Sequence, residues 1–221
     1  MRALFSRISS RYDLVNRILS LGQDRRWRRQ ALALAQIPPG GRLLDVATGT
    51  GDVALMAKKS RPDSRVIGVD LTAAMVRQAT TKDERSTVGW SVADGLALPF
   101  PDDRFDGVIS AFMMRNVPDV AQALAEQRRV VRSGGRVVCL EMTWPRRFPM
   151  AQLFHAYFFG WAPLVGWLFT GDMEAYQYLP GSVRNFMGPE AMEREMAEVG
   201  LREIFRRMMM LGTVGLYVGV K

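Results

Sequence analysis

Glycines and carboxylates gather in residues 45–52, and their spacing is suited to binding a nucleotide. Gly49 and Gly51 follow a short apolar run, so the backbone there can turn sharply and approach a ligand closely. A helix that starts after such a turn points its free N–H groups at the ligand. Asp70 ends the next apolar run, nineteen residues after Gly51, where a carboxylate can accept hydrogen bonds from both hydroxyls of a ribose. The pattern therefore predicts a nucleotide-binding turn.

Two cofactor classes fit this turn. Residues 49–54 also match the dinucleotide fingerprint, with alanine at its last position. Asp45 precedes the turn, where it can face an ammonium group or simply fix a loop, and Asp94 follows the third expected strand, where it can accept from an adenine amino group. Asp52 would repel a pyrophosphate, although it also suits a helix N-terminus in its own right. This ring of carboxylates favours S-adenosylmethionine, a sulfonium cation, over a nicotinamide dinucleotide.

The elements that must position these residues alternate between strands and helices. Apolar runs separated by segments with helical spacing are typical of a parallel sheet covered on both faces. Residues 212–220 alternate in hydrophobicity, which predicts an amphipathic edge strand at the C-terminus. We expect the other strands over 43–46, 66–70, 88–92, 105–110 and 136–142, and helices over 3–20, 31–35, 53–59, 73–80, 120–131 and 189–199.

Composition places the chain among single-domain globular proteins. Its 221 residues are 48% hydrophobic, which suits one α/β domain. The net charge of +8 predicts a nucleic acid or an anionic bilayer as a binding partner, or else simply a soluble protein from an arginine-rich proteome. Cys139 and His155 are the only residues of their kinds, so we expect neither a disulfide framework nor a metal site. No secretory leader is recognisable, which predicts a cytoplasmic location.

An aromatic segment over 153–169 holds phenylalanine, tyrosine and tryptophan at a density unusual for one helix. Pro163 interrupts it, and seventeen residues is at the short limit for crossing a bilayer. We interpret the segment as an apolar lid over a greasy ligand, with ordinary core packing as the alternative. The basic cluster at 25–29 is expected to touch lipid head groups. A nucleic-acid-binding function is disfavoured, because the chain lacks the aromatic and basic strand platform of such proteins.

Several further motifs resemble the ubiquinone/menaquinone biosynthesis C-methyltransferase family, which includes demethylmenaquinone methyltransferases. The Tyr-Asp pair at 12–13 and the Arg-Asn-Val run at 115–117 are specific to that family, whereas the glycine turn occurs across the wider superfamily. The resemblance is carried by residues 5–16, 20–22, 27–29, 93–106, 115–119, 134–141 and 178–183.

The resemblance implies a class I, Rossmann-like α/β methyltransferase fold. Its sheet would have seven mostly parallel strands, with an antiparallel C-terminal strand and helices on both faces. It also implies a reaction in which S-adenosylmethionine methylates a ring carbon of a prenylated quinol and leaves S-adenosylhomocysteine. The favoured acceptor is demethylmenaquinol, which would become menaquinol.

The sequence motifs and the family resemblance together predict the residues of the candidate site. A ring carbon becomes far more nucleophilic when its phenol is deprotonated, so we expect Arg115 to stabilise a phenolate while water or Tyr12 relays the proton. His155 is a competing base. The candidates are Asp45, Gly49, Thr50, Gly51, Asp70, Leu71, Asp94, Gly95 and Ala111 for the cofactor; Tyr12, Arg115 and Asn116 for catalysis; and Met113, Met114, His155 and Tyr157 for the acceptor, with no metal.

The chain departs from the family on the acceptor side. The family usually has Gly-Leu where Met113 and Met114 stand, and often has histidine in place of Tyr217. The bulkier methionines keep open a second acceptor class, another small phenol of the natural-product type. A catalytically inactive scaffold is disfavoured by the intact carboxylates of the donor side.

We expect one methyltransferase domain over 1–221. It divides into an N-terminal helical cap (1–37), a cofactor-binding core (42–142), a helical lid (146–186) and a C-terminal helix with edge strands (187–221). The expected partners are a lipophilic quinol and the inner face of a membrane, with which the protein associates peripherally; no nucleic acid is expected. The sequence leaves the oligomeric state open, a homodimer included.

Overall fold

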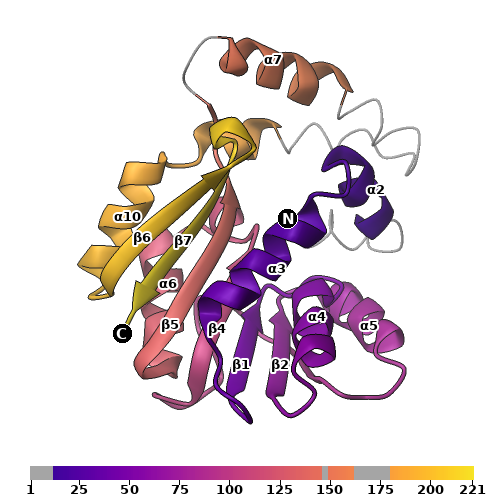
Figure 1. The fold of residues 1–221 in the computed structure, drawn as a ribbon, viewed down its shortest axis with the longest axis vertical. Coiled ribbons are helices and arrows are strands. Elements are labelled where there is room, and N and C mark those ends of the chain that lie inside the picture. Colours follow the sequence, from indigo (N-terminus) through magenta and orange to yellow (C-terminus); the bar gives the residue numbers. More distant parts are fainter. Residues whose placement is uncertain (1–11, 146–148, 162–179) are drawn as a thin grey trace.

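The computed structural model describes residues 12–145, 149–161 and 180–221, which form one sheet with helices on both faces (Figure 1). The seven strands lie in the order β3-β2-β1-β4-β5-β7-β6. They are β1 (Arg42–Val46), β2 (Arg65–Asp70), β3 (Gly89–Val92), β4 (Phe105–Ala111), β5 (Val131–Met142), β6 (Arg202–Met209) and β7 (Val214–Val220). Strands β1 to β5 pair in parallel, and β7 is antiparallel to both of its neighbours. The expected sheet is confirmed.

Each face of the sheet is covered by its own apolar cluster. Trp27 and Ala31 of α3, with Ala54 of α4, pack on one face. Leu124 of α6 and Met192 of α10 pack on the other. The named α-helices are α2 (Tyr12–Leu19), α3 (Asp24–Ala35), α4 (Asp52–Ser60), α5 (Ala73–Lys82), α6 (Val120–Val130), α7 (Met150–Ala156) and α10 (Pro189–Glu198). Residues 180–185 are also helical, and one π-helical turn follows α7 (Tyr157–Trp161). The expected helix over 3–20 is described only from residue 12 onward.

The strand order changes direction between β1 and β4, and this places the site. The chain moves outward from β1 through β2 and β3, then returns to the other side of β1 for β4 and β5. The connections that leave β1 and β4 therefore diverge and open a crevice at the carboxyl ends of these strands. The glycine turn follows β1 and the Arg-Asn-Val run follows β4, so both motifs lie at this crevice.

The C-terminal strand differs from its prediction. β7 is not an edge strand, because it lies between β5 and β6, and six of its seven residues are buried. Apolar residues cover one face, and Tyr217 packs on the other over Gly215, where an added Cβ would lie 2.6 Å from the tyrosine hydroxyl. The edge on this side of the sheet is β6; further edge strands were expected within 187–221, but no residue range was predicted for β6, whose charged and apolar residues show no clean alternation. β5 also begins earlier than predicted, at Val131.

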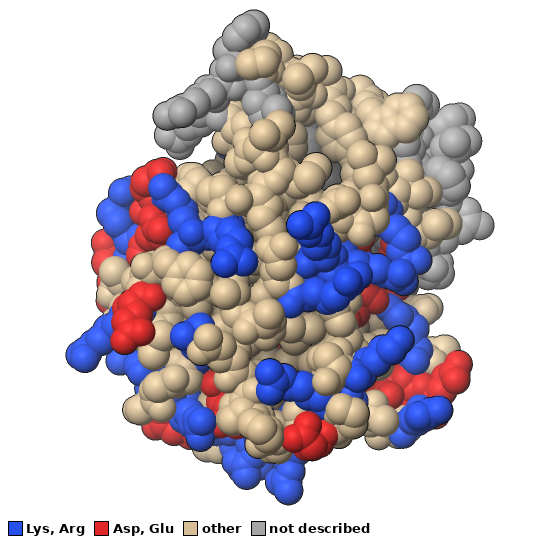
Figure 2. All heavy atoms as spheres, viewed as in Figure 1, with Lys and Arg blue, Asp and Glu red and all other residues tan. Residues whose placement is uncertain are grey.

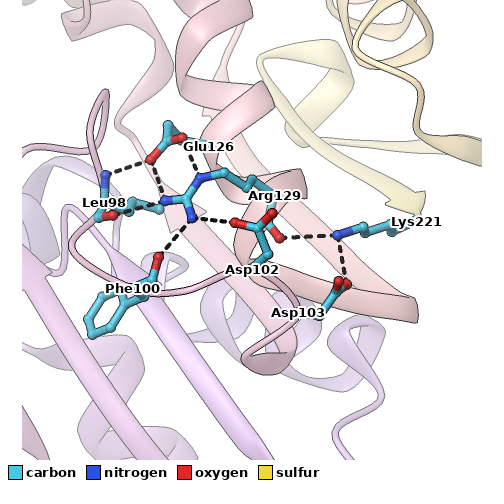
Figure 3. A network of polar contacts seen from close by, with 7 residues as sticks. All are labelled: Leu98, Phe100, Asp102, Asp103, Glu126, Arg129 and Lys221. Carbon is cyan, nitrogen blue, oxygen red and sulfur yellow. Dashed lines mark hydrogen bonds and ion pairs between the residues drawn. The ribbon is translucent and has the colours of Figure 1, made fainter.

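The Leu-Pro-Phe-Pro-Asp stretch after β3 is held by one arginine (Figure 3). Arg129 of α6 donates to the carbonyls of Leu98 and Phe100 at 2.9 and 2.8 Å. It also pairs with Asp102 and with Glu126, and the latter accepts from the Leu98 N–H. This network holds the loop that begins at Asp94, and so helps to position the wall of the crevice.

Much of the predicted lid falls outside the described residues, which include only 149–161 and 180–186 of it. Over the ranges that the structure describes, no helix has the length and hydropathy needed to cross a membrane.

Candidate functional site

A cavity opens at the carboxyl ends of β1, β2 and β4, and we call it the strand-end cavity. Six of the nine cofactor candidates line it: Gly49, Asp70, Leu71, Asp94, Gly95 and Ala111. The other three, Asp45, Thr50 and Gly51, are not on its wall.

Asp70 is anchored on the cavity wall by backbone donors. Its two carboxylate oxygens accept from the N–H groups of Gly49 and Thr72, at 2.9 and 2.8 Å. Gly49 has φ of 58°, a left-handed conformation that favours glycine, so the turn can bring its N–H to Asp70. Burial raises the pKa of Asp70, and the two backbone hydrogen bonds counter part of that rise. Asp94 is fixed in a similar way, since its carboxylate accepts from the Leu96 N–H at 2.9 Å.

Asp45 lies beneath the glycine turn. It is 1% exposed, and its Oδ2 accepts from Thr48 Oγ1 and from the Ala54 N–H. Its Oδ1 is buried and has no hydrogen-bond partner among the described residues. Burial raises the pKa of this carboxyl to about 7. Asp45 thus ties the turn to the start of α4 through Oδ2, while Oδ1 accepts no hydrogen bond from the described residues.

Thr50 and Asp52 belong to a polar cluster with α2. Thr50 Oγ1 donates to Asp13, and Lys82 Nζ reaches Asp13 at 2.8 Å, Asp52 at 2.6 Å and Thr50 at 3.2 Å. Burial raises the pKa of Asp52, but the charge and hydrogen bond of Lys82 outweigh it, and the net pKa is lowered. The charge of Asp52 is therefore balanced by Lys82 rather than left to act on a ligand.

Phe112 separates the strand-end cavity from a second cavity. Its φ of 60° is left-handed, which strains a bulky side chain and turns the chain sharply after β4. Phe112 lines both cavities, so the two meet at this residue. The second cavity has a volume of about 360 Å³, and we call it the apolar cavity. Most of its wall is apolar and comes from α2 and the turn after it, α3, α7, and the segment that leads into β7. The apolar residues include Leu19, Leu21, Trp27, Leu153, Phe154, Met210, Leu211 and Val214.

Two buried ion pairs stand on the wall of the apolar cavity. Arg28 Nη1 lies 2.6 Å from Asp24 Oδ2, and Arg115 Nη1 pairs with Glu141. The guanidinium carbons of Arg28 and Arg115 lie 5.5 and 5.6 Å from the centroid of the Phe112 ring. The Nε of Arg115 is buried and has no partner in the described part of the chain. Charge in this cavity is thus concentrated around Phe112.

The remaining candidates are spread around Phe112, where the two cavities meet. Asn116 donates to the Phe112 carbonyl at 2.9 Å and, like Met113, lines the strand-end cavity. Met114 is buried and lines a third cavity, which it shares with Arg115. Tyr157 lines the apolar cavity.

Among the candidates whose side chains are described, His155 also lies away from the two main cavities. His155 is exposed and stacks on Phe159 with ring centroids 4.4 Å apart, and it is on the wall of neither cavity. The side chain of Tyr12 lies outside the described residues.

Three residues at or near the place where the two cavities meet were not among the candidates predicted from the sequence: Arg28, Glu141 and Phe112. Arg28 was counted with the lipid-facing cluster, but Trp27 and Arg28 face inward, and only Arg25, Arg26 and Arg29 are exposed. The i, i+4 spacing of Asp24 and Arg28 was the available signal. Glu141 ends a buried strand, and such a carboxylate needs partners, which is the argument that identified Asp70. Phe112 offered no signal beyond its place in the family motif.

The geometry suits a cationic nucleoside beside an apolar acceptor, and comparisons with known proteins agree with it. In the described residues no group of three or more His, Cys, Asp or Glu side chains is placed to hold a metal. The sequence matches the ubiE/COQ5 methyltransferase family over residues 1–221.

Two relatives and one solved structure illustrate the match. The ubiquinone/menaquinone biosynthesis C-methyltransferase UbiE of Geobacter sulfurreducens is 43% identical over 226 aligned positions, covering 100% of this chain and 88% of the relative. A demethylmenaquinone methyltransferase of Thermus thermophilus is 43% identical over 218 positions, covering 98% and 99%. A SAM-dependent methyltransferase of Thermotoga maritima, described as a possible histamine N-methyltransferase, is 17% identical with a TM-score of 0.67 and full coverage of both chains, which shows the fold. This chain belongs to the ubiE/COQ5 methyltransferase family.

Proposed function

We propose that the protein methylates a ring carbon of a prenylated quinol, with demethylmenaquinol as the favoured acceptor and menaquinol as the product. The observation that carries this proposal is the meeting of two cavities at Phe112, one walled by carboxylates and the other apolar. A donor and an acceptor that occupy them would come together at that ring.

S-adenosylmethionine is the methyl donor of this enzyme, as of its family. When bound, it supplies an electrophilic methyl group on a sulfonium sulfur. The strand-end cavity fits such a group: Asp70 and Asp94 stand on its wall as acceptors, and the unpartnered Asp45 oxygen lies beneath the turn. We therefore assign Gly49, Asp70, Leu71, Asp94, Gly95 and Ala111 to direct cofactor contact and Asp45, Thr50 and Gly51 to support of the turn.

The acceptor side is proposed from the apolar cavity and from the names of the relatives. A prenylated ring needs a largely apolar cavity with a few polar groups near the reacting carbon. Arg115 meets the second requirement, because it lines the cavity and its described side-chain hydrogen bonds all leave from Nη1, so other N–H groups of the guanidinium remain for a ring oxygen. A fixed positive charge there lowers the pKa of the phenol and stabilises the phenolate. Transfer would join the methyl group of the donor to this ring carbon and leave the donor as S-adenosylhomocysteine, and the ring carbon would then lose its proton to water.

Peripheral contact with a membrane is part of the proposal. Leu21 and Leu211 are each 80% exposed, both line the apolar cavity, and both have left-handed φ angles of 51° and 56°. Strained leucines held outward at the rim of a cavity suit an environment in which they meet lipid. The exposed Arg25 and Arg26 of α3 would then face head groups. We also propose the division of the chain into an N-terminal cap (1–37), a cofactor-binding core (42–142), a lid (146–186) and a C-terminal part (187–221).

The test is transfer of a labelled methyl group in a single turnover. The acceptors are a reduced prenylated demethylnaphthoquinol, the corresponding benzoquinol and soluble phenols. We expect the prenylated naphthoquinol to show at least about tenfold higher kcat/KM than the soluble phenols, because each buried methylene adds about 0.8 kcal/mol. A soluble phenol that reacts faster would contradict the proposed acceptor.

Two variants test the role of Arg115 in the same assay. Arg115→Lys keeps a charge beside Glu141, so the fold is preserved, but it removes Nε and the planar fork. We expect a transfer rate at least about tenfold lower, as for loss of a charged hydrogen bond. His155→Ala should keep the wild-type rate, because that side chain is exposed and lies away from both main cavities. The reverse pattern would make His155 the base.

A further inference from the structure

The apolar cavity contains a second arginine that the proposed reaction has not used. Arg28 of α3 is 8% exposed, lines this cavity and pairs with Asp24 through Nη1. Asp24 in turn accepts from Ser20 Oγ at 3.0 Å. Arg28 is therefore held in place by one oxygen of a fixed carboxylate, and a guanidinium has five N–H donors.

Arg28 and Arg115 are arranged alike with respect to one ring. Their guanidinium carbons lie 5.5 and 5.6 Å from the Phe112 centroid, so the two groups are no further apart than the sum of these distances. Each has its own buried carboxylate partner, on α3 and on β5 respectively. Both arginines also line the apolar cavity, so an acceptor ring that rests near Phe112 would have two guanidinium groups close by, each able to donate a hydrogen bond of about 2.9 Å.

A purely structural role explains this arrangement poorly. Burying an ion pair removes two charges from water, and well-packed apolar residues of similar size are often at least as stabilising. The surrounding wall, with Leu19, Trp27 and Val214, is apolar, so a hydrophobic pair would fit. Two separate ion pairs in one apolar cavity point instead to a ligand with two polar groups.

We propose that Arg28 is a second acceptor-binding residue and that, together with Arg115, it makes the cavity selective for aromatic rings with two opposed hydroxyl groups. This rests on the proposed function, which it makes more specific. Arg115 addresses the oxygen whose phenolate activates the reacting carbon. Arg28 holds the opposite oxygen and so sets the rotation of the ring about Phe112, while the remaining apolar wall takes the side chain. A ring with one hydroxyl satisfies only one of the two arginines.

The experiment compares three acceptors: a prenylated 1,4-dihydroxynaphthalene with a free ring position, and the two monomethyl ethers that cap one hydroxyl each. We expect Arg28→Met to lower kcat/KM for the diol by roughly 10- to 100-fold, the loss expected for a hydrogen bond to a charged group. One of the two ethers, whose capped oxygen faces Arg28, should react slowly with the wild type and change less than about twofold in the variant. The preference for the diol over that ether should therefore disappear.

Controls separate this role from a structural one. Arg28→Met leaves Asp24 buried without its partner, so the double variant Asp24→Asn with Arg28→Met is measured as well and should show the same loss of preference. Arg206→Met removes another arginine with carboxylate partners, far along the chain on β6, and should keep the preference. Equal losses for all three acceptors, or no loss for any, would overturn the assignment of Arg28. Failure of the wild type to methylate any prenylated quinol would instead overturn the proposed function.

Discussion

Asp45 shows how one buried side chain couples the cofactor turn to pH. Its pKa is raised to about 7, first by burial and also by the nearby charge of Asp70, against hydrogen bonds from Thr48 and Ala54 and the charge of Arg28. The folded protein therefore binds a proton at Asp45 in a pH range where the unfolded chain has lost it. A cation bound nearby would favour the ionised form.

A prediction at this scale concerns stability against pH. Because the folded pKa lies above the unfolded value of 3.8, the contribution of Asp45 to the stability of the cofactor-free protein should fall as pH rises from about 4 to about 7, and stay lower above that. Asp45→Asn removes this dependence. Relative to the variant, the wild type should lose up to about 4 kcal/mol of unfolding free energy over that range.

Denaturant unfolding at a series of pH values measures this difference. Asp70 also has a raised pKa and is present in both proteins, so the difference between the two curves reports Asp45 together with its electrostatic effect on Asp70. Parallel curves for wild type and variant would show that Asp45 is ionised in both the folded and the unfolded protein.

At the scale of elements, α2 joins the donor side to the acceptor side. Its Asn16 and Leu19 line the apolar cavity, while Asp13 on the same helix contacts Thr50 of the glycine turn and Lys82 at the end of α5. The hydroxyl of Tyr157, beyond α7, donates to the Leu19 carbonyl and holds the other end of the helix. The position of this acceptor wall thus depends on contacts with the cofactor turn.

Lys82→Met tests that dependence. The ion pairs of Lys82 are partly exposed, so their loss should cost only about 0.5–1 kcal/mol of stability. We expect the KM for the acceptor to rise about threefold to tenfold and the Kd for the cofactor to change less, because Asp70 still anchors Gly49. The control is Lys59→Met, an exposed lysine on α4. A cofactor Kd that rises more than the acceptor KM would argue against this role of α2.

At the scale of the whole molecule, charge and apolar surface are separated. On the face drawn in Figure 2, the described residues at the end where α7 lies are uncharged, and Lys and Arg side chains, with some Asp and Glu, lie below them. An uncharged end next to cationic side chains suits a bilayer with anionic lipids. The acceptor would then reach the apolar cavity from the membrane side.

Charge reversal of Arg25, Arg26 and Arg29 to glutamate tests this orientation. Each arginine near an anionic surface contributes about 1 kcal/mol, so retention on anionic vesicles should fall by roughly 100-fold or more. Reversal of the exposed Lys59, Arg77 and Arg85, on and beyond α4 and α5, is the matched control. Equal losses in both triple variants would mean that net charge, rather than this face, directs binding.

Local pattern was enough to predict much of this protein. The parallel strands before residue 142, the helices between them and the turn with Gly49 and Asp70 depend on periodicity and on backbone conformations that only certain residues adopt, and these are local properties. They brought six cofactor candidates to one cavity. The place of the Arg-Asn-Val run at the end of β4 was predictable for the same reason.

Only the tertiary structure decided which side chains meet. The spacing of Asp24 and Arg28 does not reveal that both face a cavity, because the inward face of α3 is set by its packing on the sheet. Likewise, β7 lies inside the sheet rather than at its edge, because β6, the strand that follows α10, pairs with its outer side. Burial and pairing of this kind depend on contacts between residues far apart in the chain, so Arg28, Glu141 and Phe112 gained a common place at the acceptor cavity only when the chain folded.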